Sequence, residues 1–245
     1  MWGLVLLAIA GGAAVVRAVR SAGSDAAPSG SSDSSGFRIP EHAHAWLPFF
    51  RAAGQARGVP VDVALAFAFR ESKFQPTAYN PEPGAMAVWA EKIATRPQKW
   101  GANPEFVKAK EVHRRLEAGE ATGKDIAAAD KGKPFAEKLW TFGSVGIMQV
   151  TRISADAAGY VAARPNAGLF DPATNIAAGV GEIAIWRSIM FKGREPGELD
   201  DEDWATVRAA YVMGGGNVAK YPEKAEEKRV LFRSALKAVR PQVTA

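Results

Sequence analysis

The order of apolar and polar positions divides the chain into three unlike parts. Residues 1–16 form an apolar run without a charged side chain. Residues 21–36 are rich in serine and glycine, which is typical of a flexible linker that packs no core. From residue 37 onward, apolar residues recur at the spacing of amphipathic helices. The pattern therefore predicts one folded domain over residues 37–245, preceded by a linker and an apolar segment.

The folded part is expected to be helical throughout. Its most apolar segment is residues 61–74, which follows Pro60 and is apolar nearly all round, so it predicts a central buried helix. No segment alternates with period two over the length of a strand, and the predicted fold class is all-α. Further helices are expected over residues 41–55, 86–93, 104–118, 124–129, 135–140, 154–163, 175–191, 204–212 and 222–239.

The apolar run at the start suits a membrane anchor over residues 1–20. As a helix, residues 1–16 reach roughly 24 Å, slightly less than a hydrocarbon core of about 30 Å. A secretory signal peptide has basic residues before its apolar run, and no basic residue precedes this one. An uncleaved anchor is therefore favoured over a signal segment. Arg17 and Arg20 follow the run and are a weak bias toward a cytoplasmic domain, which leaves the orientation open.

Composition excludes several kinds of chemistry. The chain has no cysteine, which removes disulfides, thiol nucleophiles and cysteine metal sites. It has three histidines, so a three-histidine metal centre would need all of them, and we expect no metal and no cofactor. The net charge of +5 belongs wholly to residues 37–245 and favours an anionic partner.

One carboxylate stands on the most apolar predicted helix. Glu71 lies near the end of residues 61–74, and Phe67 and Phe74 share its helix face. A carboxylate on an apolar face loses hydration, which disfavours its charged form and suits a general acid. The alternative is an ordinary glutamate at a helix end, paired with Lys73 or with a more distant basic residue. The helix by itself favours this second interpretation.

Three later segments add candidate chemistry. Residues 142–150 read FGSVGIMQV, in which two glycines allow close backbone approach to a ligand and an amide offers both donor and acceptor. The same residues also suit a plain helix start with Ser144 as its cap. Residues 169–179 read LFDPATNIAAG, and residues 209–218 read AAYVMGGGNV, where Tyr211 stands before a glycine loop.

Taken in order, these motifs resemble those of the soluble lytic transglycosylases, a family with a goose-type-lysozyme-like fold. Each motif alone is a weak signal, but four in the same order are specific. The resemblance covers residues 37–218 apart from an insert. The matching segments are A-F-R-E-S-K-F-Q-P-T-A (68–78), G-S-V-G-I-M-Q-V (143–150), F-D-P-A-T-N-I-A-A-G (170–179) and A-Y-V-M-G-G-G-N-V (210–218).

The resemblance implies that Glu71 is the sole catalytic acid and base. It would protonate the glycosidic oxygen between N-acetylmuramic acid and N-acetylglucosamine in peptidoglycan. It would then take the proton of the C6 hydroxyl as that oxygen attacks C1, which gives a 1,6-anhydro product. Positions that hold the sugar chain match Ser144, Met148, Gln149 and Tyr211. Supporting positions match Ser72, Gly143, Gly146 and Asn217.

The chain departs from the family pattern in two places. Val212 stands where the family has an asparagine after the tyrosine. Residues 84–141 form a helical insert between the first two motifs, as in some transglycosylases of type IV secretion systems and phages. Within it, residues 92–115 hold seven basic and two acidic side chains, a net charge equal to that of the whole chain. Such a face is either simply solvated or a cleft wall that attracts anionic glycan.

Alternative functions stay open at this point. A hydrolytic muramidase would need a second carboxylate, for which Glu82 and Glu182 are candidates. Val212 leaves room for a non-catalytic wall-binding or assembly component of a secretion machine or virion. The expected partners are peptidoglycan strands and, through residues 1–16, a membrane; no motif supports nucleic acid. The domain is expected to face the cell wall from its membrane anchor, or to belong to a virion.

Overall fold

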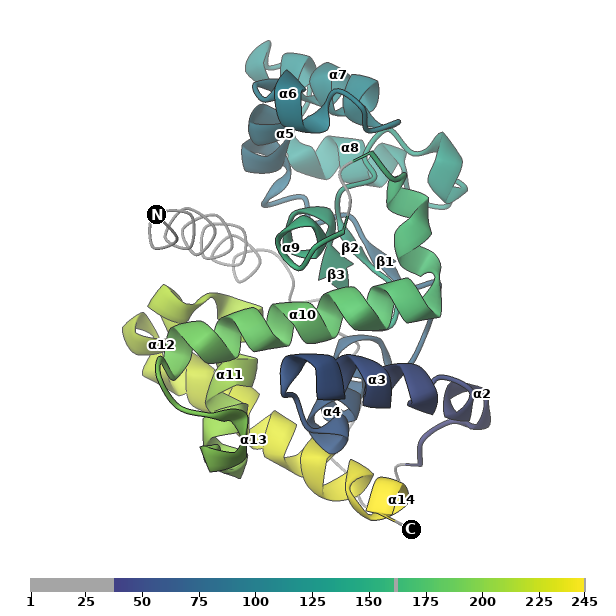
Figure 1. Cartoon of the computed structure of the whole chain (residues 1–245). Helices are drawn as coiled ribbons and strands as arrows, with labels where there is room; N and C mark the ends of the chain where they lie inside the picture. The colour runs from purple at the N-terminus through teal and green to yellow at the C-terminus, as the bar shows by residue number, and fades with distance from the viewer. Residues whose placement is uncertain (1–37, 161–162, 245) are drawn as a thin grey trace.

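The computed structural model describes residues 38–160 and 163–244 (Figure 1). The anchor and linker expected over residues 1–36 lie outside these residues. In the described part of the chain, no helix combines the length and apolar character needed to cross a bilayer.

Helix α10 (Pro172–Met190) crosses the middle of the molecule (Figure 1). It begins at Pro172 because Asp171 caps it by accepting from the Thr174 N–H at 2.8 Å. Helices α3 (Leu47–Arg57) and α11 (Asp201–Met213) pack against α10, and α13 (Pro222–Val239) packs on α11. Shorter helices are α2 (Glu41–His44), α9 (Arg152–Ala157), α12 (Gly215–Lys220) and α14 (Pro241–Thr244), with 3-10 turns at Phe135–Glu137, Asn166–Phe170 and Pro196–Glu198.

Helix α4 (Val61–Ser72) confirms the central buried helix expected from the sequence. Its residues 63–68 are all buried in the main hydrophobic core, where α4 packs on α3 and α13. Phe67 contacts Phe232 of α13 edge to face, with ring centroids 5.0 Å apart. The helix ends where Lys73 takes a left-handed backbone conformation with φ of 54°.

The insert forms a lobe with a hydrophobic core of its own, which we call the insert lobe. It consists of α5 (Met86–Ala94), α6 (Pro97–Trp100), α7 (Phe106–Glu117) and α8 (Gly123–Ala129). It stands at the top of Figure 1, away from α4 and α13. Trp89 and Trp140 stack in its core with ring centroids 6.4 Å apart.

A small antiparallel sheet corrects the expectation of a purely helical domain. Its strands are β1 (Tyr79–Asn80), β2 (Ser144–Val145) and β3 (Val150–Thr151), with β2 in the middle. Tyr79 pairs with Val145, which in turn pairs with Val150. Strands of two residues are too short to show a period-two pattern, so no apolar pattern predicts them.

Three expected helices also differ from the structure, and the one expected over residues 154–163 is α9, which ends at Ala157. The helix expected over residues 41–55 is broken at Ala45 and Trp46, because Pro48 takes the first turn of a new helix. The helix expected over residues 135–140 is a single 3-10 turn. The N–H groups of Leu139 and Trp140 donate to the Asp130 carboxylate at 3.0 and 2.9 Å, which replaces helical pairing.

Buried polar side chains join the insert lobe to the rest of the domain. Arg152 of α9 donates to the Asn166 side chain at 2.6 Å. Asn166 donates to the Thr141 carbonyl at 3.0 Å, and its N–H donates to Glu105 of the insert lobe at 3.3 Å. Because buried polar groups are costly to leave unpaired, this network fixes the insert lobe relative to the rest of the domain.

Arg240 follows the end of α13, and its ion pairs should make the stability of the fold depend on pH at acidic values. Its guanidinium hydrogen-bonds Asp201 at 2.8 Å, which holds the pKa of that carboxyl below its ordinary value, and it also pairs with Asp62 at 2.7 Å. A carboxyl with a lowered pKa stabilises the fold above its unfolded pKa, near 4, and loses this contribution as the pH falls toward the folded value.

We therefore expect Arg240→Gln to lower the free energy of unfolding by about 1 kcal/mol or less at neutral pH, because solvent screens exposed pairs. The deficit should shrink as the pH falls below about 4. Urea unfolding of both proteins across this range measures it, and a deficit that does not change with pH would refute the assignment.

Candidate active site

Glu71 lies in the last turn of α4 and forms an ion pair with Arg208 of α11. Its Oε1 lies 2.8 Å from Arg208 Nη1, and only 11% of its side chain is exposed. The structure therefore gives this glutamate a basic partner, as the second sequence interpretation allowed. The partner is a distant arginine rather than Lys73, and the pair is largely withdrawn from solvent, unlike an ordinary pair at a helix end.

The loop of residues 143–150, called the 143–150 loop below, is held from three helices. Ser72 of α4 donates to the Ile147 carbonyl at 2.7 Å. Tyr211 of α11 donates to the Met148 carbonyl at 2.8 Å, and Asn175 of α10 accepts from the Met148 N–H at 2.7 Å. All four sequence motifs therefore meet at this loop, next to Glu71.

Two glycines of the motifs are required by this packing. Gly146 has a φ of 72°, and a side chain there would collide with the amide of Asn175. Gly179 of α10 lies against the Met148 side chain, so a Cβ at Gly179 would overlap it. The loop can approach α10 this closely only because both positions lack a side chain.

The four residues predicted to bind sugar have protein contacts of their own. Met148 and Tyr211 are buried, and Ser144 donates to the buried Glu82 carboxylate at 2.5 Å. The Gln149 side-chain amide donates to the Gly146 carbonyl at 3.0 Å. These contacts show how the residues are held, and their contact with sugar remains a prediction.

Residues with strained backbone conformations lie next to Glu71 and in the 143–150 loop. Among the described residues, the non-glycine residues with positive φ are Lys73, Phe74, Glu82 and Gln149. Lys73 and Phe74 directly follow Glu71 and Ser72, and Gln149 lies in the 143–150 loop. Such conformations cost about 1–3 kcal/mol each and persist where the surroundings impose them, commonly at functional sites.

The remaining predicted supporting residues have structural contacts. Gly143 lies against the Asn80 carbonyl so closely that a side chain would not fit. Asn217 of α12 donates to the Met213 carbonyl at 2.8 Å and so closes the end of α11. Val212, at the family's asparagine position, packs against the hydrophobic core.

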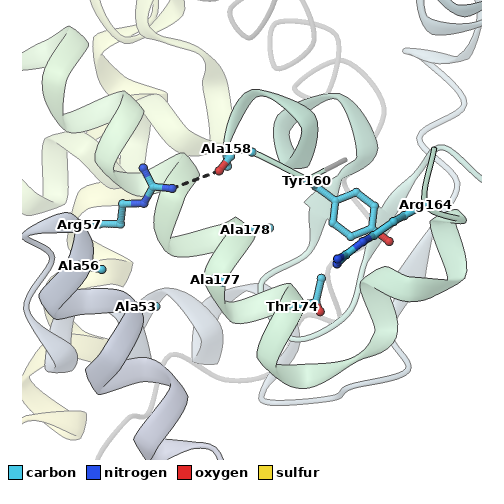
Figure 2. Close-up of a pocket in the computed structure, with 10 residues that line it drawn as sticks. Ala53, Ala56, Arg57, Ala158, Tyr160, Arg164, Thr174, Ala177 and Ala178 are labelled. Carbon is cyan, nitrogen blue, oxygen red and sulfur yellow. Dashed lines mark hydrogen bonds between the residues drawn. The ribbon is translucent and has the colours of Figure 1, made fainter. Parts of the chain in front are cut away.

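A separate hollow of about 410 Å³ lies between α3, the segment after α9, and α10 (Figure 2). Alanines form much of its wall, and Arg57 donates to the Ala158 carbonyl at one edge. None of the sequence-predicted site residues lines it. Within the described residues, no cluster of three or more histidine, aspartate or glutamate side chains is suited to a metal.

Residues 120–230 match the family model of the transglycosylase SLT domain. This segment of the chain resembles an SLT domain. The match includes the 143–150 loop, α10 and α11, and it confirms the resemblance to the soluble lytic transglycosylases. It supports peptidoglycan lytic transglycosylase activity in general, with peptidoglycan as the substrate. Neither a curated protein nor a solved structure matches the chain.

Sequence reasoning missed Arg208, although it lies within the residues that match the family model. A signal was present, because Arg208 is the lone charge in the apolar stretch of residues 204–213. It lies one helical turn before Tyr211, on the same helix face. Glu71 itself lies before the matched residues, so its place in the site comes from the folded geometry.

Proposed function

We propose that this protein is a peptidoglycan lytic transglycosylase that uses Glu71 as its single acid and base. The observation that supports this most is the meeting of Glu71 with the 143–150 loop, α10 and α11 around one buried pair. These are the segments that carry the four family motifs, and they come from places up to 140 residues apart in sequence. The proposed role is local opening of the cell wall.

In the proposed reaction, Glu71 begins protonated and gives its proton to the glycosidic oxygen. The bond from that oxygen to C1 of N-acetylmuramic acid breaks, and N-acetylglucosamine leaves as the alcohol. The C6 hydroxyl oxygen of the same muramic acid attacks C1 and gives its proton to the Glu71 carboxylate. The bonds formed and broken balance without water, and Glu71 ends protonated as it began.

The product distinguishes this reaction from hydrolysis. We expect the full chain to release muropeptides from purified sacculi whose muramic end is lighter by one water than a reducing end. Mass spectrometry before and after borohydride reduction measures this, because only a reducing end takes up hydrogen. Reducible ends would instead favour a hydrolytic muramidase, with Glu82 or Glu182 as its second carboxylate. No release at all would favour a non-catalytic wall-binding or assembly component.

The insert lobe is proposed as a surface that attracts anionic glycan. Lys110 of α7 is exposed beside Phe106, whereas Arg114 is already paired with Glu111 and Glu120 at 2.8 and 2.6 Å. The charge available to a polymer on this helix is therefore smaller than the sequence suggested.

Reversing Lys108 and Lys110 to glutamate should weaken retention of the full chain on purified sacculi. The loss should be largest at low salt and fade as salt is added, because salt screens exposed charges. A matched reversal of Lys224 and Lys228 on α13 controls for net charge. Equal retention of both double variants would show that this face of α7 is only solvated.

We propose that residues 1–16 tether the domain to a membrane, with the domain on the side that faces the wall. The support is the apolar run and the linker that follows it. A tether would confine cleavage to nearby wall. The full-length protein should stay in the membrane fraction after carbonate extraction, and its recovery in the supernatant would contradict the tether.

A further inference from the structure

Arg208 reaches Glu71 from the helix opposite to it. The two side chains belong to α11 and α4, and their exposed fractions are 9% for Arg208 and 11% for Glu71. An arginine is almost never buried without a partner, since withdrawing its charge from water is costly. Its place here is therefore a specific feature of the site and not a solvated surface charge.

Two aromatic rings hold the guanidinium of Arg208 in place. Its Cζ lies 5.4 Å from the ring centroid of Phe67 and 5.7 Å from that of Tyr211. Phe67 precedes Glu71 by four residues on α4, and Tyr211 follows Arg208 by three on α11, so each pair shares a helix face. The two rings also contact each other edge to face, with centroids 5.1 Å apart. Cation–π contacts of this kind orient a planar guanidinium.

Tyr211 also connects this arrangement to the 143–150 loop through its hydrogen bond to the Met148 carbonyl. The position of Arg208 is thus linked to the position of the loop. Ser72, the residue after Glu71, is attached to the same loop through the Ile147 carbonyl. A shift of the Arg208 guanidinium would therefore move the Glu71 carboxylate relative to the 143–150 loop.

We propose that Arg208 is the positioning residue of Glu71, an inference that rests on the proposed function. In the single-glutamate reaction the same side chain gives a proton and later accepts one, so it must keep its place in both states. Arginine stays protonated throughout, so its guanidinium can stay beside Oε1 of the acid and of the carboxylate alike. The proposal assigns the transferred proton to the other oxygen, Oε2.

The test compares Arg208→Lys and Arg208→Met with the wild-type full chain on soluble, uncrosslinked peptidoglycan strands. Arg208→Met should lower kcat about 100-fold, the size expected when a reacting group loses its alignment, and should change KM by less than about threefold. Arg208→Lys should recover part of kcat, because lysine supplies the charge without the planar fork. Arg233→Met, which removes an arginine of α13 paired with Glu202 of α11 and Glu226 of α13, is the matched control and should retain wild-type kcat.

Stability provides a second readout in case Arg208→Met folds poorly. Glu71→Gln and Arg208→Met should each lower the melting temperature, since each leaves a buried polar partner behind. The double variant should recover part of that loss, because the two residues act as a unit. A strictly additive loss would overturn the pairing.

The outcomes separate this inference from the proposed function. An active wild type with inactive Glu71→Gln, but with kcat of Arg208→Met within twofold of wild type, overturns the inference and leaves the function intact. So does a loss confined to KM, or a kcat that lysine does not recover. An inactive wild type, or an active Glu71→Gln, refutes the proposed function itself.

Discussion

Replacing Glu71 with glutamine should abolish muropeptide release from purified sacculi. Glutamine fills the same space but has no acidic proton to give to the glycosidic oxygen and no carboxylate to take one back. General acid–base catalysis contributes roughly 100- to 10,000-fold to a rate, and one residue carries both steps here, so release should fall by at least about 100-fold.

The controls for this variant use other glutamates of the chain. Glu91→Gln changes an exposed glutamate of α5 and should keep wild-type activity. Glu82→Gln and Glu182→Gln test the two candidates for a second carboxylate, and neither should reproduce the loss. Circular dichroism and melting temperature establish that Glu71→Gln is folded, which matters because it leaves Arg208 without its charged partner. A folded Glu71→Gln protein with near wild-type activity would end the assignment.

Asn175→Ala should cause the largest loss of stability of any single change considered. Its side chain accepts from the Met148 N–H at 2.7 Å and donates to the Val145 and Leu169 carbonyls, each at 2.8 Å. Asn175 is fully buried, so alanine would leave three backbone groups without partners and without room for bulk water. An unsatisfied buried group costs about 1–3 kcal/mol, so the free energy of unfolding should fall by about 3 kcal/mol or more.

Urea unfolding measures this effect as a lower midpoint at an unchanged slope. Thr174→Ala, one residue earlier on α10, is the matched control, because the Thr174 hydrogen bond to Asp171 uses its backbone N–H. It should change the free energy of unfolding by less than about 0.5 kcal/mol. A loss below about 1 kcal/mol for Asn175→Ala would mean that the 143–150 loop is not held as described.

The parts of the fold predicted from sequence are those that local pattern determines. Apolar residues on nearly every side of α4 indicated burial, and most of α10 was predicted as the helix over residues 175–191. The strands of two residues left no period to detect. The 3-10 turn at Phe135–Glu137 depends on Asp130, whose role in pairing with Leu139 and Trp140 appears only after folding.

In the candidate site, too, local sequence predicted some features, and others depend on tertiary packing. The motifs predicted that Glu71, Met148, Gln149 and Tyr211 belong to one site, because their order along the chain resembles a family. They did not predict the Arg208 partner, since contact between α4 and α11 is a property of tertiary packing. Nor did they predict that Ser144 would be hydrogen-bonded to Glu82. Helix register placed Phe67 beside Glu71, but only the folded chain brings Arg208 between Phe67 and Tyr211.

The central claim is that one glutamate cleaves the glycan without water as a reactant. It is tested most directly by digesting sacculi with the full chain in water labelled with heavy oxygen and weighing the released muropeptides. Attack by the C6 hydroxyl predicts muramic ends that carry no label and are lighter by one water than reducing ends. Heavy oxygen at C1 of the released muramic acid would show hydrolysis and contradict the account.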